Sequence, residues 1–64
     1  MTPAELRADR ATLGLSLKQF GLACGLQGKS VARMIRAMEA GEKEISERMA
    51  AAARALLSEY GAAP

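Results

Sequence analysis

The stretch Gly28–Glu39, with the sequence GKSVARMIRAME, has two chemically different sides when it is placed on an α-helix. Four apolar side chains share one side at the helical period of about 100° per residue: Val31, Met34, Ile35 and Met38. Three cations share the opposite side, within an arc of about 60° at that period: Lys29, Arg33 and Arg36. The pattern favours either a helix that packs on a core and binds a polyanion, or a helix whose basic side faces only water.

The chain has few means of stabilising a fold other than a helical core or a partner chain. It has 64 residues, a size at which a domain buries only about 60% of its unfolded surface. Its single cysteine cannot form an intrachain disulfide, and without histidine it lacks a Cys/His zinc set and the usual general base near neutral pH. Half of the residues are apolar, which argues against disorder. We therefore expect one domain, residues 1–64, that is not an enzyme and has no catalytic residues, cofactor or metal.

The positive charge of the chain is local. The net charge is +2, and the three cations of the basic side contribute +3, so the remaining residues sum to −1. This distribution is typical of a binding surface and not of a polybasic tail. The chain has no apolar run of membrane-spanning length, and the N-terminal sequence MTPAELRADR has no signal-peptide pattern. We expect a cytoplasmic protein with a free thiol and no membrane partner.

The first half of the chain has two clear helix starts. Thr2 and Glu5 match a capping box, which predicts a helix over about residues 3–13. Ser16 and Gln19 match a second capping box, which predicts a helix over about residues 17–24. Three residues of this second helix are expected to face the core: Phe20, Ala23 and Cys24.

Glycines in the first half of the chain predict a helix end and a close contact. Gly14 suits the left-handed position that ends a helix. Gly21, inside the second predicted helix, costs about 0.5–1 kcal/mol relative to alanine. Close approach of another helix would compensate this cost.

The second half of the chain predicts two further helices. The third covers about residues 28–39, with Gln27 as its expected cap and Gly41 after its end. Ser46 caps a fourth helix over about residues 46–60. Its apolar residues recur at helical spacing: Met49, Ala52, Ala53, Leu56 and Tyr60. Because no strand alternation is present, the expected fold class is all-α, a compact bundle of four to five helices.

Three short motifs occur in order along the chain. Residues 13–16 (LGLS) match the pattern L-G-[LM]-S, residues 20–26 (FGLACGL) are similar to L-A-x-x-L-G-[VI], and residues 38–43 (MEAGEK) are similar to W-E-x-G-x-[RK]. Together they resemble the Cro/C1-type helix-turn-helix family over about residues 3–57. The segment Gly25–Glu39 is about four residues longer than in that family, which corresponds to one additional helical turn.

The resemblance implies a lambda-repressor-like fold whose third helix enters the major groove of DNA, with the second helix lying across the backbone. Five residues are then expected to read bases: Gln27, Lys29, Ser30, Arg33 and Arg36. Arg33 is the first choice, because its guanidinium matches guanine O6 and N7. Lys18 and Lys43 are expected to contact phosphates, although both also suit the role of plain solubilising charges.

The resemblance favours a sequence-specific transcriptional regulator, a repressor that blocks its operator by occupancy. A phage or mobile-element origin and control of its own operon would fit the small size. One short half-site binds weakly, so we expect a homodimer on palindromic double-stranded DNA, formed through the C-terminal helix, without a small-molecule ligand. The alternative is a protein-interaction module, or an antitoxin-like protein, whose basic helix docks on an acidic partner.

Overall fold

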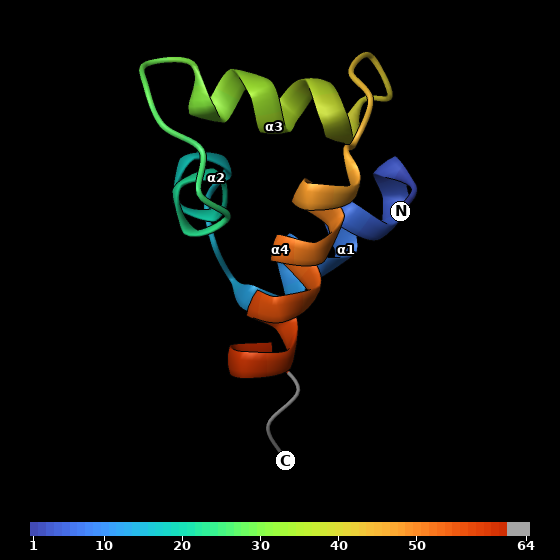
Figure 1. Cartoon of the computed structure of the whole chain (residues 1–64), viewed down its shortest axis with the longest axis vertical. Coiled ribbons are helices and arrows are strands. Elements are labelled where there is room, and N and C mark those ends of the chain that lie inside the picture. Colours follow the sequence, from blue (N-terminus) through green and yellow to red (C-terminus); the bar gives the residue numbers. More distant parts are fainter. Residues whose placement is uncertain (62–64) are drawn as a thin grey trace.

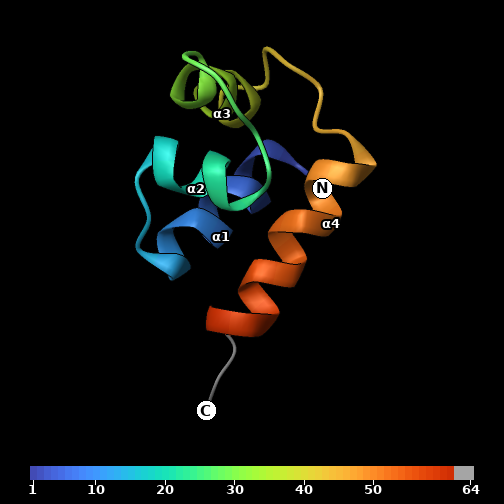
Figure 2. The same ribbon diagram turned by 60° about the vertical axis from the view of Figure 1, so that its left-hand side comes forward.

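The computed structural model describes residues 1–61, and all regular structure in that range is helical (Figure 1). The elements are α1 (Pro3–Leu13), α2 (Leu17–Ala23), α3 (Val31–Glu39) and α4 (Glu47–Leu56), followed by one π-helical turn, η1 (Leu57–Gly61). They form a bundle of 33 × 22 × 18 Å, with α3 at one end of the long axis and η1 at the other (Figures 1 and 2). The prediction of an all-α bundle is confirmed for these residues. None of the helices in this range has the length and apolar character needed to cross a lipid bilayer.

Three helices begin with the caps that the sequence predicts. Thr2 Oγ1 accepts a hydrogen bond from the Glu5 N–H at 3.1 Å, and the Glu5 carboxylate accepts one from the Thr2 N–H at 2.7 Å. Ser16 and Gln19 form the same reciprocal pair at the start of α2, and Ser46 Oγ caps α4. These bonds satisfy N–H groups that lack a helical partner, so the three starts need no tertiary contact.

The start of α3 differs from the prediction. Gly28 has a φ of +103°, in the left-handed region, so it cannot begin a right-handed helix. The helix begins at Val31, and Ser30 takes the N-cap position that was expected for Gln27. The residues before Val31 therefore belong to the α2–α3 loop, residues 24–30, and not to a longer third helix.

Two helices also end earlier than predicted. Cys24, with φ −83° and ψ 0°, is the C-cap of α2, so that helix ends at Ala23. The regular part of α4 ends at Leu56, and the chain then widens into η1 up to Gly61. Gly14 ends α1 with a φ of +68°, as the sequence predicts.

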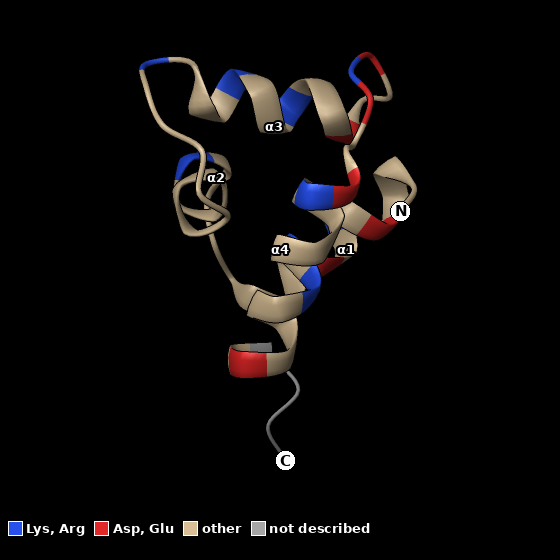
Figure 3. Cartoon of the chain, viewed as in Figure 1, with Lys and Arg blue, Asp and Glu red and all other residues tan. Residues whose placement is uncertain are grey.

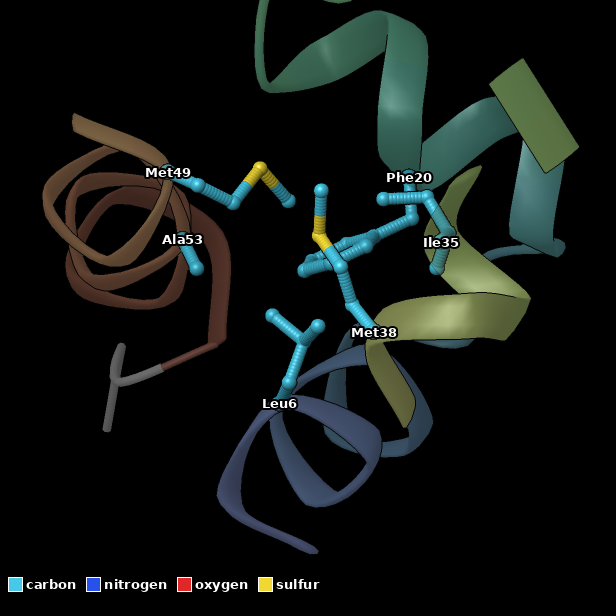
Figure 4. Close-up of a cluster of buried hydrophobic side chains, with 6 residues drawn as sticks. All are labelled: Leu6, Phe20, Ile35, Met38, Met49 and Ala53. Carbon is cyan, nitrogen blue, oxygen red and sulfur yellow. The ribbon is translucent and has the colours of Figure 1, made fainter. Parts of the chain in front are cut away.

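The core is one cluster of six buried side chains from all four helices (Figure 4): Leu6, Phe20, Ile35, Met38, Met49 and Ala53. The aromatic ring of Phe20 lies among the other side chains of the cluster. Ala23 is exposed, which corrects the prediction that it faces the core. The inner face of α2 runs from Phe20 toward Cys24 and Gly21, and Ala23 lies about 110° from its centre at 100° per residue.

Close packing of α2 against α3 confirms the interpretation of Gly21. A methyl group at Gly21 would collide with Val31 Cγ1 and would lie 3.1 Å from Ile35 Cγ1. The two backbones approach this closely because glycine has no side chain. The same contact holds α3 against the body of the protein by its apolar side.

Candidate nucleic-acid interface

The two sides of α3 have the environments that their chemistry predicts. Val31, Ile35 and Met38 are buried in the core side of the helix, with Met34 half-buried beside them. Arg33 and Arg36 are exposed on the outer side. Figure 3 shows these basic positions along the end of the molecule formed by α3. The helix therefore packs with one side and presents cations with the other.

Three of the predicted base-reading residues do not lie on this helix. Gln27, Lys29 and Ser30 are in the α2–α3 loop or at its junction with α3, and all three are exposed. The loop also contains Gly25 and Gly28, both with positive φ. The predicted row of Lys29, Arg33 and Arg36 on one helix face is thus wrong for Lys29, which extends the basic surface from a loop.

The N-terminal end of α3 is open. Ser30 makes no side-chain hydrogen bond to the first turn, and that turn contains no acidic residue. In α1, α2 and α4, by contrast, a Thr or Ser side chain accepts a hydrogen bond from the first turn. The first N–H groups of α3 and the positive end of its dipole are therefore available to an anion.

The cations of this surface are not neutralised by carboxylates of the described chain. Within residues 1–61, the ion pairs closer than 4 Å join Glu39 to Arg7 and Arg10. Seven exposed cations thus have no carboxylate partner in this range. Two of them, Arg48 and Arg54, belong to α4, and the other five lie on α3 or on the segments around it: Lys18, Lys29, Arg33, Arg36 and Lys43. Unpaired cations gathered at one end of a small fold produce the local positive potential that a polyanion requires.

Lys18 and Lys43 differ in their surroundings. Lys18 lies in the first turn of α2, where Figure 3 shows a basic residue without an acidic neighbour on that helix. Lys43 lies between Glu42 and Glu44 in the loop after α3, so this loop carries a net charge of −1 over residues 42–44. The geometry supports a phosphate contact for Lys18 more strongly than for Lys43.

A bidentate ion pair joins α1 to the C-terminal end of α3, and the sequence analysis missed it. Arg10 Nε donates to Glu39 Oε2 at 2.7 Å, and Arg10 Nη2 donates to Glu39 Oε1 at 3.2 Å. Arg10 Nη1 also donates to the Leu15 carbonyl at 3.1 Å, and Arg7 Nε lies 3.8 Å from Glu39 Oε1. The hydrogen bond to Glu39 raises the pKa of the Arg10 guanidinium.

The spacing of residues along the sequence could have predicted this ion pair. Glu39 follows Ile35 by four residues and Arg10 follows Leu6 by four residues, so both charged groups extend the inner faces of their helices. The Glu39 side chain is only 6% exposed and that of Arg10 is 24% exposed. Two opposite charges on inner faces indicate a pair, because a buried charge is rarely left without a partner.

Cys24 shows no sign of a reactive site. Its side chain is half-buried at the end of α2, and burial raises the pKa of its thiol. A raised pKa reduces the thiolate fraction and hence the nucleophilicity of the sulfur. This agrees with a packing role.

The opposite end of the bundle contains an apolar groove. A groove of about 550 Å³ lies between the ends of α1, α2 and α4, lined by Leu13, Leu15, Ala23, Leu56 and Tyr60. Two large apolar side chains are exposed in the described chain, Tyr60 at 69% and Leu22 at 48%. The molecule thus has a basic end at α3 and, at the opposite end, an apolar groove beside η1.

Comparisons with protein-family models, with curated proteins and with solved structures found no match to this chain.

Proposed function

We propose that this chain is a sequence-specific DNA-binding protein that represses transcription by occupying its operator. The observation that supports it best is α3, which packs by one side and carries Arg33 and Arg36 without carboxylate partners on the other. Its open N-terminal end adds hydrogen-bond donors for a phosphate. A basic, exposed helix side next to such donors suits the major groove of duplex DNA.

In this proposal, α2 and α3 form a helix-turn-helix of the Cro/C1 type within a lambda-repressor-like fold. The connection of residues 24–30 is longer than the three or four residues typical of that motif. Gln27 and Lys29 lie in this loop, before the N-terminal end of α3, so they extend the contact surface beyond the bases that α3 reaches. The proposal implies a cytoplasmic protein that is not an enzyme.

The residue roles follow from these positions. Arg33 and Arg36, on the exposed side of α3, are the proposed base contacts, with Arg33 first because it is nearer to the open helix end. Ser30, Lys29 and Gln27 contact phosphates or base edges from the loop. Lys18 contacts a phosphate from the first turn of α2, and Lys43 makes at most a weak contact, because its glutamate neighbours repel phosphate.

We also propose a homodimer, whose geometry the shape of the monomer restricts. The helix α3 lies at one end of the long axis, and α4 runs from its vicinity toward the other end (Figures 1 and 2). A two-fold axis perpendicular to the long axis of the monomer would place the two α3 helices at opposite ends of the dimer. They could not then enter the grooves on one face of a duplex. The two-fold axis must therefore run along the long axis, with a flank of α4 at the contact and half-sites about 34–36 Å apart.

The test is a titration of the purified protein with DNA from upstream of its own gene and with a scrambled duplex of equal composition, at several salt concentrations. A duplex pool selected from a random library by the protein provides a second specific probe. We expect the specific duplex to bind at least about 10³ times more tightly than the scrambled one. Arg33→Ala should remove most of this margin and leave salt-dependent non-specific binding in place.

Two outcomes contradict the proposal. Equal binding of both duplexes with a steep salt dependence would mean that only phosphates are held, as in an architectural protein. Absence of binding to either duplex and to the selected pool would leave an acidic protein partner as the better explanation of the basic surface. Arg7→Ala, which removes an exposed arginine from α1, outside the proposed DNA and dimer surfaces, is the matched control and should leave the specific margin unchanged.

A further inference from the structure

We propose that Arg10 and Glu39 are positioning residues, which set the orientation of α3 on the body of the protein and thereby the specificity of DNA binding. This inference rests on the proposed function. Within residues 1–61, three side-chain hydrogen bonds reach beyond a helix and its own N-cap residue, and all three are made by Arg10. Two of them hold Glu39 at the end of α3, and the third holds the Leu15 carbonyl before α2.

The location of Glu39 is unfavourable for the helix alone. It is the last residue of α3, where the negative end of the helix dipole disfavours a carboxylate. It also lies at the end of the molecule that would face DNA phosphates. A carboxylate that is 6% exposed in this position requires a cation, and Arg10 supplies one at 2.7 Å. The Arg10 guanidinium thus compensates the negative charge of Glu39, which both the helix dipole and a bound polyanion would disfavour.

The two hydrogen bonds between Arg10 and Glu39 restrict the relative orientation of the side chains as well as the distance between them. The planar guanidinium of Arg10 donates from Nε and Nη2 to the two oxygens of Glu39, an arrangement that a lysine ammonium cannot reproduce. The other end of α3 joins a loop with two left-handed glycines and has no side-chain cap. Apolar contacts along α3 are not directional, so the C-terminal pair is the directional contact that holds Arg33 and Arg36 in register with the groove.

Replacement of both partners by apolar residues separates positioning from stability. An ion pair replaced by apolar side chains of similar volume often leaves stability unchanged or higher, whereas loss of one partner leaves an uncompensated charge. The double variant Arg10→Met/Glu39→Met is therefore expected to fold, with a cooperative thermal transition. It should nevertheless lose orientation of α3, because the thioether side chains make no directional bond.

The experiment measures binding of the selected duplex and of the scrambled duplex to the wild type, to the double variant, to Arg10→Lys and to Arg7→Met. We expect the ratio of specific to non-specific affinity to fall at least tenfold in the double variant, with non-specific affinity and its salt slope unchanged. Arg10→Lys, which keeps the charge, should give a smaller fall. Arg7→Met is the matched control, because Arg7 is 71% exposed and 3.8 Å from the same carboxylate, and it should keep the ratio.

The outcomes distinguish this inference from the proposed function. A folded double variant with a specificity ratio within twofold of the wild type would overturn the positioning role and leave the DNA-binding proposal intact. A wild type without specific binding would overturn both. If the double variant does not fold, Arg10→Lys decides, since a folded Arg10→Lys protein with an unchanged ratio also contradicts the proposal. Faster hydrogen exchange of α3 amides in the variants, with α2 amides unchanged, is the expected structural signature.

Discussion

The helices α2 and α3 pack against each other, yet their N-terminal ends are built in opposite ways. The start of α2 is closed by its own residues, since Ser16 and Gln19 satisfy each other's backbone donors. The start of α3 is preceded by a glycine-containing loop and carries no side-chain cap. A closed end contributes to folding, and an open end retains hydrogen-bond donors for a ligand. The comparison agrees with the proposed function, in which α2 contributes mainly to stability and α3 to DNA binding.

The largest expected effect is a difference in the free energy of unfolding between a core variant of α2 and a surface variant of α3. Phe20→Ala should destabilise the fold by about 3–5 kcal/mol, because it removes a fully buried ring from the centre of the core. Arg33→Ala should change the free energy of unfolding by less than about 0.5 kcal/mol, since its side chain is exposed. Thermal unfolding followed by circular dichroism measures both. Comparable losses in the two variants would contradict the assignment of stability to α2.

A substitution at the contact between the helices should have an intermediate effect. Gly21→Ala places a methyl group against Val31 and Ile35, and the resulting overpacking should cost about 1–3 kcal/mol. Gly25→Ala meets no neighbouring atom but should also lose stability, by about 1–2 kcal/mol, because its φ of +96° is strained for alanine. Urea denaturation measures the two. A stabilised Gly21→Ala protein would show that α2 and α3 can separate without loss of packing.

An acidic cap on α3 should separate stability from binding. Ser30→Asp adds a side-chain acceptor and a negative charge at an open helix start, which should stabilise the fold by about 0.5–1 kcal/mol. The same carboxylate would repel a phosphate and should weaken DNA binding about tenfold, equivalent to about 1.4 kcal/mol. Parallel unfolding and DNA titrations test this. Unchanged DNA affinity in a stabilised protein would mean that the open end does not contact DNA.

Removal of the serine hydroxyl at each of the two N-cap positions, Ser16 and Ser30, should test the contrast between the two helix starts directly. Ser16→Ala should cost about 1 kcal/mol, because the Gln19 N–H loses its acceptor. Ser30→Ala should cost a few tenths of a kcal/mol at most, since the Ser30 side chain caps nothing. The difference in unfolding midpoints between the two variants is the relevant measurement, and equal midpoints would remove the distinction between the two helix starts.

The smallest expected effect is a pH dependence from the end of α2. Burial raises the pKa of the Cys24 thiol, so the folded state favours the neutral form. The resulting stabilisation is present below the ordinary thiol pKa, and it is lost as the pH rises through the raised value. The wild type should therefore lose stability more steeply than Cys24→Ala as the pH rises above the ordinary thiol pKa of about 8.5. Identical slopes in this range would show that the thiol does not titrate differently on folding.

Features of the fold that depend on neighbours in the sequence were predictable. The caps at Thr2, Ser16 and Ser46 each join residues three positions apart, so residue identity and spacing are sufficient to place them. The buried and exposed sides of α3 follow from the helical period alone. Gly21 was correctly interpreted as a close contact, because a glycine inside a helix requires compensation from packing.

The candidate site was predicted only in part. Arg33 and Arg36 were placed correctly on an exposed helix side, but Lys29 and Gln27 were expected near a helix start and lie in a loop. The error arose at Gly28, whose identity permits both a helical and a left-handed conformation. Local sequence could not distinguish these conformations, because the choice depends on how far the chain must travel from α2 to reach the packed face of α3.

By itself, the sequence determined the helical class, three of the four helix starts and the two-sided character of α3, because these depend on contacts within one or two turns. The tertiary structure decided where α3 begins, how the loop of residues 24–30 displaces Lys29, and which carboxylate Arg10 pairs with. Arg10 and Glu39 are 29 positions apart. They pair only because Leu6, Phe20 and Ile35 bring α1 and α3 together in one core. A rule based on neighbouring residues cannot predict a contact between positions so far apart in the sequence.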